Sequence, residues 1–479
     1  MKNLISKLIF IFFFGLIILT VILTTTGLET RKFNTIIKKN INIYNSNINL
    51  NLNEIKFKLD IKQVSLFLES SNVKINYHNF KIPTKTLKVY VDFVSIIKSK
   101  PKIKKVILDV NELDINQLKK MSLIFKPSNL NSFVKNKITQ GKLKMELEIY
   151  FTNENLLENF IARGTVTNLK ANLKNKINLD KTNFSFFADK ADILIQNIFA
   201  ETGPIKIING DMKLRISNGI MLDSNFKTSL LYAGKFKEYM ELIKDSEYTK
   251  NLEYLEADLN NNFSINFDET YKVKNYNYQS AGKIIKANFN FQNPLDNFLL
   301  NEKINKFSLA NTNIKTIVTP KKNSIDASGK YSLNKSNFLM FSLNNIFDNK
   351  LLNLKLNIDY DKLIDLKVIN YNKPKNIISN ISKILEKKGK NTKIKELNYT
   401  DGSNKILAED IILNEGKFSS LKNISVQTNK EDKKNNNFSI SFGKIISIKG
   451  NLLDANNLIQ FIDNNNNNNN NIFSKINKK

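Results

Sequence analysis

The chain has 479 residues, a formal net charge of +29, a single histidine, and neither cysteine nor tryptophan. Without cysteine it can form no thiol nucleophile, disulfide or Cys-ligated metal centre. With His78 as its only histidine, a multi-histidine metal site is excluded, and a Ser-His-Asp triad would depend on that one residue. We interpret His78 as an exposed bystander on a strand or turn.

The positive charge comes almost entirely from lysine, because Arg31, Arg163 and Arg215 are the only arginines. Proteins that read DNA bases rely on the bidentate contacts of arginine. Lysine enriched together with Asn, Ile and Phe is instead typical of an AT-rich genome. We therefore expect no nucleic-acid partner, although surplus lysines can favour a surface near anionic lipid head groups.

The first element expected is a membrane anchor. Residues Leu8 to Gly27 form twenty uncharged residues, about the length that spans the hydrocarbon core of a bilayer. A cleaved signal peptide is the alternative, but Thr24–Gly27 is a poor cleavage site. The lysine-bearing amino terminus predicts that the bulk of the chain lies outside the cytoplasm. The expected anchor residues are Leu8, Ile9, Phe10, Phe12, Phe13, Leu16, Ile17, Leu19, Ile22 and Leu23.

After the anchor, apolar and polar residues alternate in segment after segment, which is the pattern of half-buried antiparallel strands. Gly and Pro are too scarce to supply the sharp turns of a sandwich. We therefore predict a mainly β protein, in which an N-terminal transmembrane helix precedes an elongated, twisted antiparallel sheet curled into a groove, with a few short helices. The residues expected to line this groove are Ile55, Phe57, Leu59, Leu66, Leu68, Leu143, Met145, Leu147, Ile149 and Phe151.

Three segments have helical spacing: Glu112–Ile124, Lys235–Glu256 and Pro374–Gly389. The poly-Asn tail at residues 463–479 is of low complexity, and we expect it to be disordered. The expected organisation is an anchor at residues 1–30, a β-groove at 31–462 and the tail. A motif L-D-x-N-x-L occurs at Leu113–Leu118 and again at Leu453–Leu458. In both places we expect the Asp to cap a short helix.

Several of these features together resemble the AsmA-like envelope family, in particular its YhdP-type branch. They are the Gly27–Asn34 segment after the anchor, the early alternating segment with Ile82-Pro83 and Val91-Asp92-Phe93, and Ile448–Ala455. The last of these resembles a family segment in which Gly450, Asp454 and Ala455 are the matching residues. YhdP-type members continue beyond this point, whereas this chain enters poly-Asn. It is expected to be a shorter relative, a truncated product or half of a split protein.

The resemblance implies a single-pass protein of the inner membrane of a Gram-negative-type envelope, with its bulk in the periplasm. It also implies a β-groove that conducts phospholipid toward the outer membrane. The alternative is a scaffold for outer-membrane biogenesis without lipid conduction. No signature of an enzyme, a metal site or a cofactor occurs in the sequence, so we expect no catalytic residues and no cofactor. Its partners would be membrane phospholipids and an envelope protein docked on the last strand near Phe438–Gly450.

Overall fold

The structure is a computed structural model that describes residues 2–31, 34–35, 37–38, 48–52, 54–77, 80–92, 95, 102–123, 129–152, 156–173, 178–217, 219–233, 251–270, 272–295, 303–348 and 350–456. The described residues divide into two units, one formed by residues 1–226 with 267–272 and the other by 227–266 with 273–479. Each unit is described by itself. The predicted tail at residues 463–479 and His78 lie outside the described residues.

The elements of the first unit are α1 (Lys2–Thr24), β1 (Leu28–Thr30), β2 (Ile48–Asn51), β3 (Ile55–Asp60), β4 (Ser65–Ser71), β5 (Lys74–Tyr77), β6 (Phe80–Val91), β7 (Ile103–Asp114), α4 (Ile115–Ser122), α5 (Asn129–Asn136), β8 (Ile138–Phe151), β9 (Leu157–Asn172), β10 (Asn178–Ala188), β11 (Asp192–Thr202) and β12 (Ile205–Ser217). The next two strands, β13 (Gly219–Tyr232) and β14 (Leu252–Phe267), contribute residues to both units.

The elements of the second unit are β15 (Val273–Leu295), β16 (Ile304–Val318), β17 (Lys322–Leu333), β18 (Leu339–Asp348), β19 (Leu351–Tyr360), β20 (Ile364–Leu366), the 3-10 turn η2 (Lys367–Ile369), β21 (Tyr371–Lys373), β22 (Ser379–Lys388), β23 (Asn391–Asp401), β24 (Asn404–Asn414), β25 (Lys417–Ser420), β26 (Asn423–Lys430), β27 (Lys433–Phe442) and β28 (Ile446–Leu452).

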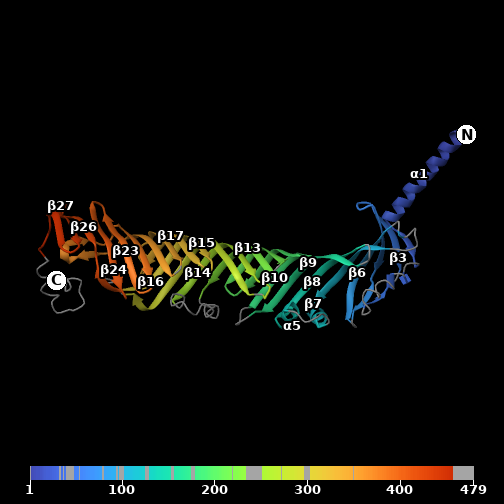
Figure 1. Cartoon of the computed structure of the whole chain (residues 1–479), viewed down its shortest axis with the longest axis horizontal. Coiled ribbons are helices and arrows are strands. Elements are labelled where there is room, and N and C mark those ends of the chain that lie inside the picture. The colour runs from blue at the N-terminus through green and yellow to red at the C-terminus, as the bar shows by residue number, and fades with distance from the viewer. Residues whose placement is uncertain are drawn as a thin grey trace. The chain divides into compact units, whose positions relative to one another are not determined.

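Most strands pair antiparallel with their neighbours in the chain, as β7 to β10 do where they lie side by side in Figure 1. Among the described residues, 26 strands belong to one sheet, and β20 and β21 form a separate pair. The sheet is not closed, because β1 pairs only with β3 and β28 only with β27 in the described part of the chain. The expected fold class is therefore confirmed: a mainly β chain with one large antiparallel sheet, an apolar N-terminal helix and few other helices.

Helix α1 is apolar enough to cross a membrane. Its stretch Ile5–Thr24 has a mean hydropathy of 2.7, and none of it is buried by the rest of the protein. The threonines at its end remain compatible with a helix because Thr20 donates to Leu16 O at 2.8 Å and Thr25 to Val21 O at 2.7 Å. Twenty residues rising about 1.5 Å each cover the hydrocarbon thickness of a bilayer.

Gly27 closes the end of α1 against β3. Its amide donates to Ile22 O at 2.8 Å, and its φ of 73° is a left-handed conformation that glycine adopts without strain. A Cβ at this position would lie 2.8 Å from Lys58 Cγ and 3.0 Å from Phe57 O. The glycine after the apolar run therefore allows the helix end to approach the sheet closely.

The first unit has its hydrophobic core at the amino-terminal end of its sheet. Residues of β2 to β7 bury one another there, among them Ile55, Leu68 and Val89. From β8 to β12, by contrast, the buried apolar residues in the described part are only Ile138, Ala171 and Ala200. The apolar residues of β8 to β12 are therefore mostly half-buried in the described residues, and helices α4 and α5 contact β8.

The helix expected at Glu112–Ile124 is present in shorter form as α4. Asp114 begins it with a capping box, in which its Oδ1 accepts from Gln117 N and Gln117 Oε1 accepts from Asp114 N, both at 2.9 Å. Glu112 belongs to strand β7 instead. Of the helix expected at Lys235–Glu256, residues 235–250 lie outside the described part, and residues 252–256 belong to β14.

The helix expected at Pro374–Gly389 is wrong, because Ser379–Lys388 form strand β22. The i, i+3, i+4 spacing of its isoleucines also places Ile381 and Leu385 on one face of a strand. Pairing with β19 on one side and β23 on the other satisfies the backbone of β22, and this outweighs the local preference. Asn376, with φ of 71°, separates the strand from Pro374.

Candidate functional site: the apolar face of the sheet

The ten residues expected to line a groove differ in their surroundings. Ile55 and Leu68 are buried in the hydrophobic core of the first unit, with Phe57 and Phe151 packed against it. Leu59 and Leu66 are half-buried and line a hollow beside the turn between β3 and β4. The residues from β8 are half-buried, namely Leu143, Met145, Leu147, Ile149 and Phe151.

On β8 the apolar residues face small partners across the ladder. Met145 pairs with Gly164 and Leu147 with Ala162 on β9. A Cβ at Gly164 would lie 3.0 Å from the ring of Phe186 on β10. The small side chains leave room for the larger ones of the neighbouring strands, so the apolar face is continuous from β8 to β10.

The opposite face of β8 carries ion pairs. Arg163 on β9 bridges Glu146 and Glu148, the second pair at 2.9 Å, and Tyr150 donates to Glu148 Oε2 at 2.6 Å. Burial, followed by the hydrogen bond to Glu148, raises the pKa of Tyr150 to about 12. The two faces of this single-layer sheet therefore differ sharply in polarity.

In the second unit one row of side chains crosses ten strands at equivalent ladder positions. It runs from β16 to β28 through consecutive pairs of directly opposed residues, which share one face of a sheet. Its members are Ile314, Ala327, Leu343, Leu356, Lys383, Leu397, Ala408, Ile424, Ile440 and Ile448. Nine of these ten residues are apolar; we call them, with Lys383, the apolar row.

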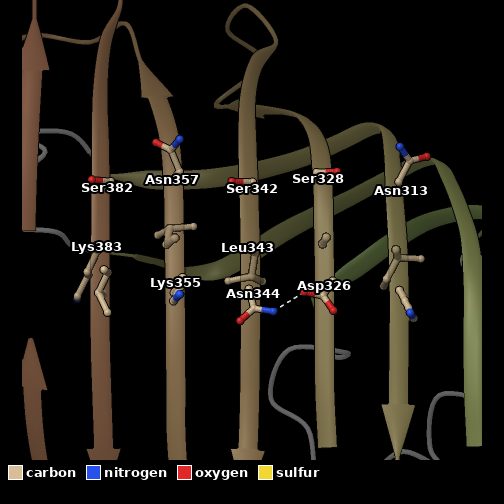
Figure 2. Close-up of a pocket in the computed structure, with 15 residues that line it drawn as sticks. Asn313, Asp326, Ser328, Ser342, Leu343, Asn344, Lys355, Asn357, Ser382 and Lys383 are labelled. Carbon is tan, nitrogen blue, oxygen red and sulfur yellow. Dashed lines mark hydrogen bonds between the residues drawn. The ribbon is translucent and has the colours of Figure 1, made fainter. Parts of the chain in front are cut away.

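The neighbouring positions on the other face are polar. Figure 2 shows five of them crossing five strands, and they are Asn313, Ser328, Ser342, Asn357 and Ser382. Below them in that view, the side-chain amide of Asn344 donates to Asp326 on the adjacent strand. Alternation along each strand thus gives the second unit one apolar and one polar face.

A hollow of about 560 Å³ lies on β16 to β19 and β22. Members of the apolar row that line it include Leu343, Leu356 and Lys383. This hollow gives an apolar ligand room against the second unit.

An insertion between β19 and β22 packs on the apolar face beside this hollow. It consists of β20, η2 and β21, and we call it the insertion hairpin (Ile364–Lys373). The Tyr371 hydroxyl contacts the Tyr399 hydroxyl at 2.7 Å and donates to Asp401 Oδ2 at 2.6 Å. Burial raises the pKa of Tyr399 to about 12. Tyr399 is opposite Ile381 on β22, and both lie two residues along their strands from the apolar row and so on the same face, whose margin the hairpin covers.

Lys373 fixes the end of the insertion hairpin. Its side chain is only 1% exposed, and its ammonium donates to Ile377 O at 2.7 Å and Pro374 O at 3.3 Å. It also lies 5.7 Å from the centre of the Tyr360 ring. Burial lowers the pKa of Lys373, which Asp401 and Asp361 partly oppose.

The residues singled out by the AsmA-like resemblance lie where the last strand ends. Gly450 on β28 is opposite Phe438, and a Cβ there would lie 2.4 Å from Asn437 O. Asp454 caps no helix in the described residues; its carboxylate accepts from Asn370 Nδ2 at 2.8 Å. Ala455, next to it, is exposed. Asp454 Oδ1 also accepts from the Asn456 amide at 3.2 Å, as a capping residue would, and the chain beyond residue 456, where the expected helix continues, lies outside the described residues.

Strand β28, expected to meet a partner, exposes apolar side chains. Ile448 is 61% exposed and Ile445, just before the strand, is 81% exposed, whereas Phe438 on β27 is buried. Eight of the expected anchor residues, those up to Leu19, are exposed on α1, while Ile22 and Leu23 are half-buried at its end, where the helix contacts β3.

Sequence reasoning missed Lys383 and the insertion hairpin. Ile381, Lys383 and Leu385 alternate with other residues in the sequence, but the i, i+3, i+4 spacing of the same segment favours a helix. In the ranges that the structure describes, no three His, Asp or Glu side chains gather so as to hold a metal ion. Comparison of the chain with known protein families, with characterised proteins and with solved structures finds no match.

Proposed function

We propose that this chain is a membrane-anchored, AsmA-like envelope protein whose apolar sheet face holds phospholipid acyl chains on their way toward the outer membrane. The observation that carries the proposal is the apolar row, which keeps one face apolar across ten strands without a second layer over the hollow. Each 100 Å² of apolar surface kept from water is worth about 2.5 kcal/mol. An acyl chain is a ligand that supplies such cover along the whole row.

Helix α1 supports the membrane part of the proposal. It would anchor the chain in the inner membrane, with residues beyond Gly27 in the periplasm, since the flanking lysines favour a cytoplasmic amino terminus. A reporter enzyme active only outside the cytoplasm, fused after Asp454, tests this placement. We expect the reporter activity to stay with the membrane fraction. It should move to the soluble fraction when residues 2–24 are replaced by a cleavable signal peptide.

Photocrosslinking from the two faces tests the lipid proposal. Benzoylphenylalanine would be placed at Met145 or Leu356 on the apolar face of the full chain, and at Lys144 and Asn353 on the polar face of the same two strands as matched controls. We expect phospholipid adducts from the first pair and few from the second. Absence of adducts at all four positions, with no co-purified phospholipid, would contradict lipid binding.

A scaffold role is the second candidate, and the exposed apolar residues of β28 favour it. An edge strand with unpaired backbone groups is a template for β-augmentation by another protein. If crosslinks from Ile448 reach a protein while Leu356 yields no lipid, the chain assembles envelope proteins without conducting lipid.

A further inference from the structure

Lys383 is the one charged residue in the apolar row. On β22 it is directly opposite Leu356 of β19 and Leu397 of β23. Along its own strand, the same face presents Ile381 and Leu385. Apolar side chains therefore surround its stem on all four sides of the sheet surface.

No anion in the described part of the chain neutralises Lys383. It takes part in no ion pair or hydrogen bond there, and burial alone lowers the pKa of its ammonium. Lys383 is half-buried, and the two lysines that are fully buried in the described residues both have partners: Lys105 lies 3.8 Å from Glu148, and Lys373 donates to two carbonyls. Charged groups that leave water are ordinarily paired, and the ammonium of Lys383 among leucines has no such partner in the described residues. An anionic ligand would supply the missing partner.

The position of this ammonium selects the kind of anion. Lys383 lines the hollow together with Leu343 and Leu356, so an anion that reaches it must bring apolar groups to cover those side chains. A free inorganic anion would leave the leucines exposed, and a neutral lipid would leave the charge unpaired. A phospholipid of net negative charge would pair with the ammonium through its head group and cover the leucines with its acyl chains.

We propose that Lys383 is the head-group contact of a binding site for anionic phospholipid, with the acyl chains lying along the apolar row on either side of it. This deepens the proposed function, on which it rests, by giving the groove a preference for charge. The flexible stem of lysine lets the ammonium rise toward the phosphate while its methylenes stay against the leucines.

The test uses the full chain with benzoylphenylalanine at Leu343, reconstituted in bilayers of equal parts phosphatidylglycerol and phosphatidylcholine. Mass spectrometry of the adducts gives the ratio of the two lipids. We expect phosphatidylglycerol to be enriched about fivefold, the effect of one lysine near an anionic lipid. Lys383→Met should reduce the ratio to that of the bilayer, and Lys383→Arg should keep the enrichment.

Lys388→Met is the matched control, because it removes one positive charge from an exposed position on the polar face of the same strand β22, outside the hollow. It should leave the ratio as in the unaltered chain. Circular dichroism verifies that each variant is folded. A ratio near one in the unaltered chain, or a ratio that Lys383→Met does not change, overturns this inference alone. If neither the unaltered chain nor any variant captures lipid, both this inference and the proposed function are contradicted.

Discussion

Asn370 donates through its side-chain amide to Oδ2 of Asp454 at 2.8 Å, although 84 residues separate them in the chain. Asn370 ends the 3-10 turn of the insertion hairpin in a left-handed conformation, with φ of 52°. Asp454 follows β28 and receives a further hydrogen bond from Asn435 Nδ2 at 3.4 Å. This contact ties the hairpin inserted after β19 to the end of the last strand.

Asp454→Ala should release this contact and lower the free energy of unfolding by about 1–2 kcal/mol. Burial works to raise the pKa of the Asp454 carboxyl, but the hydrogen bonds from Asn370, the Asn456 amide and Asn435 outweigh it and hold the pKa below its usual 3.8. The stabilisation is therefore present above pH 3.8 and is lost as the pH falls through the lowered value. Urea unfolding at pH 7 and below pH 3 measures it; Asp258→Ala, at an exposed position on strand β14, should change little.

Tyr371→Phe should destabilise the second unit by about 1–3 kcal/mol. The substitution keeps the ring, which lies edge-on to that of Tyr399 at 5.9 Å, and removes the hydroxyl that serves both Tyr399 and Asp401. A buried polar group left without its partner costs its desolvation energy. Limited proteolysis within residues 361–378 would report the loosened hairpin. Tyr254→Phe is the control, because it removes a single hydrogen bond, from the hydroxyl to Glu256. Its loss of folding stability should be less than half that of Tyr371→Phe.

Lys383→Met should make the ligand-free protein more stable by about 1–2 kcal/mol at neutral pH, because it removes an unpaired charge from apolar surroundings. Burial holds the pKa of Lys383 below the usual 10.5. The unfolded chain then binds more protons than the folded one between the lowered value and 10.5, so stability rises with pH across that window. Denaturant midpoints at pH 7 and pH 10 should show this rise in the unaltered chain and in Lys388→Met, but less of it in Lys383→Met. Equal slopes would contradict the unpaired state of Lys383.

Gly450→Ala should cost about 1–3 kcal/mol through steric overlap. The added Cβ would meet backbone atoms of β27, with Asn437 O at 2.4 Å and Phe438 Cα at 2.6 Å, and neither can move without disturbing the ladder. Gly443→Ala is the matched control, since its Cβ would find its nearest neighbour at 3.8 Å. Thermal unfolding of the two variants should differ by several degrees, and equal melting temperatures would contradict the close approach at Gly450.

The sequence by itself determined the class of the fold. Alternation such as Leu143–Phe151 marks a strand because a side chain every second residue must leave water, and this signal is local. The same holds for α1, whose length and lack of charge are visible without any partner, and for Asp114, whose cap lies within three residues of the chain.

Only the tertiary structure decided what depends on partners distant in the chain. Ser379–Lys388 suits a helix by spacing and becomes a strand because β19 and β23 pair with it. Asp114 and Asp454 share a sequence motif, but only the tertiary structure shows that Asp454 also accepts from Asn370, 84 residues away. Lys383 is one lysine among many in the sequence. The register of ten strands sets it alone among apolar side chains, and register follows from pairing between distant segments, which no local pattern encodes.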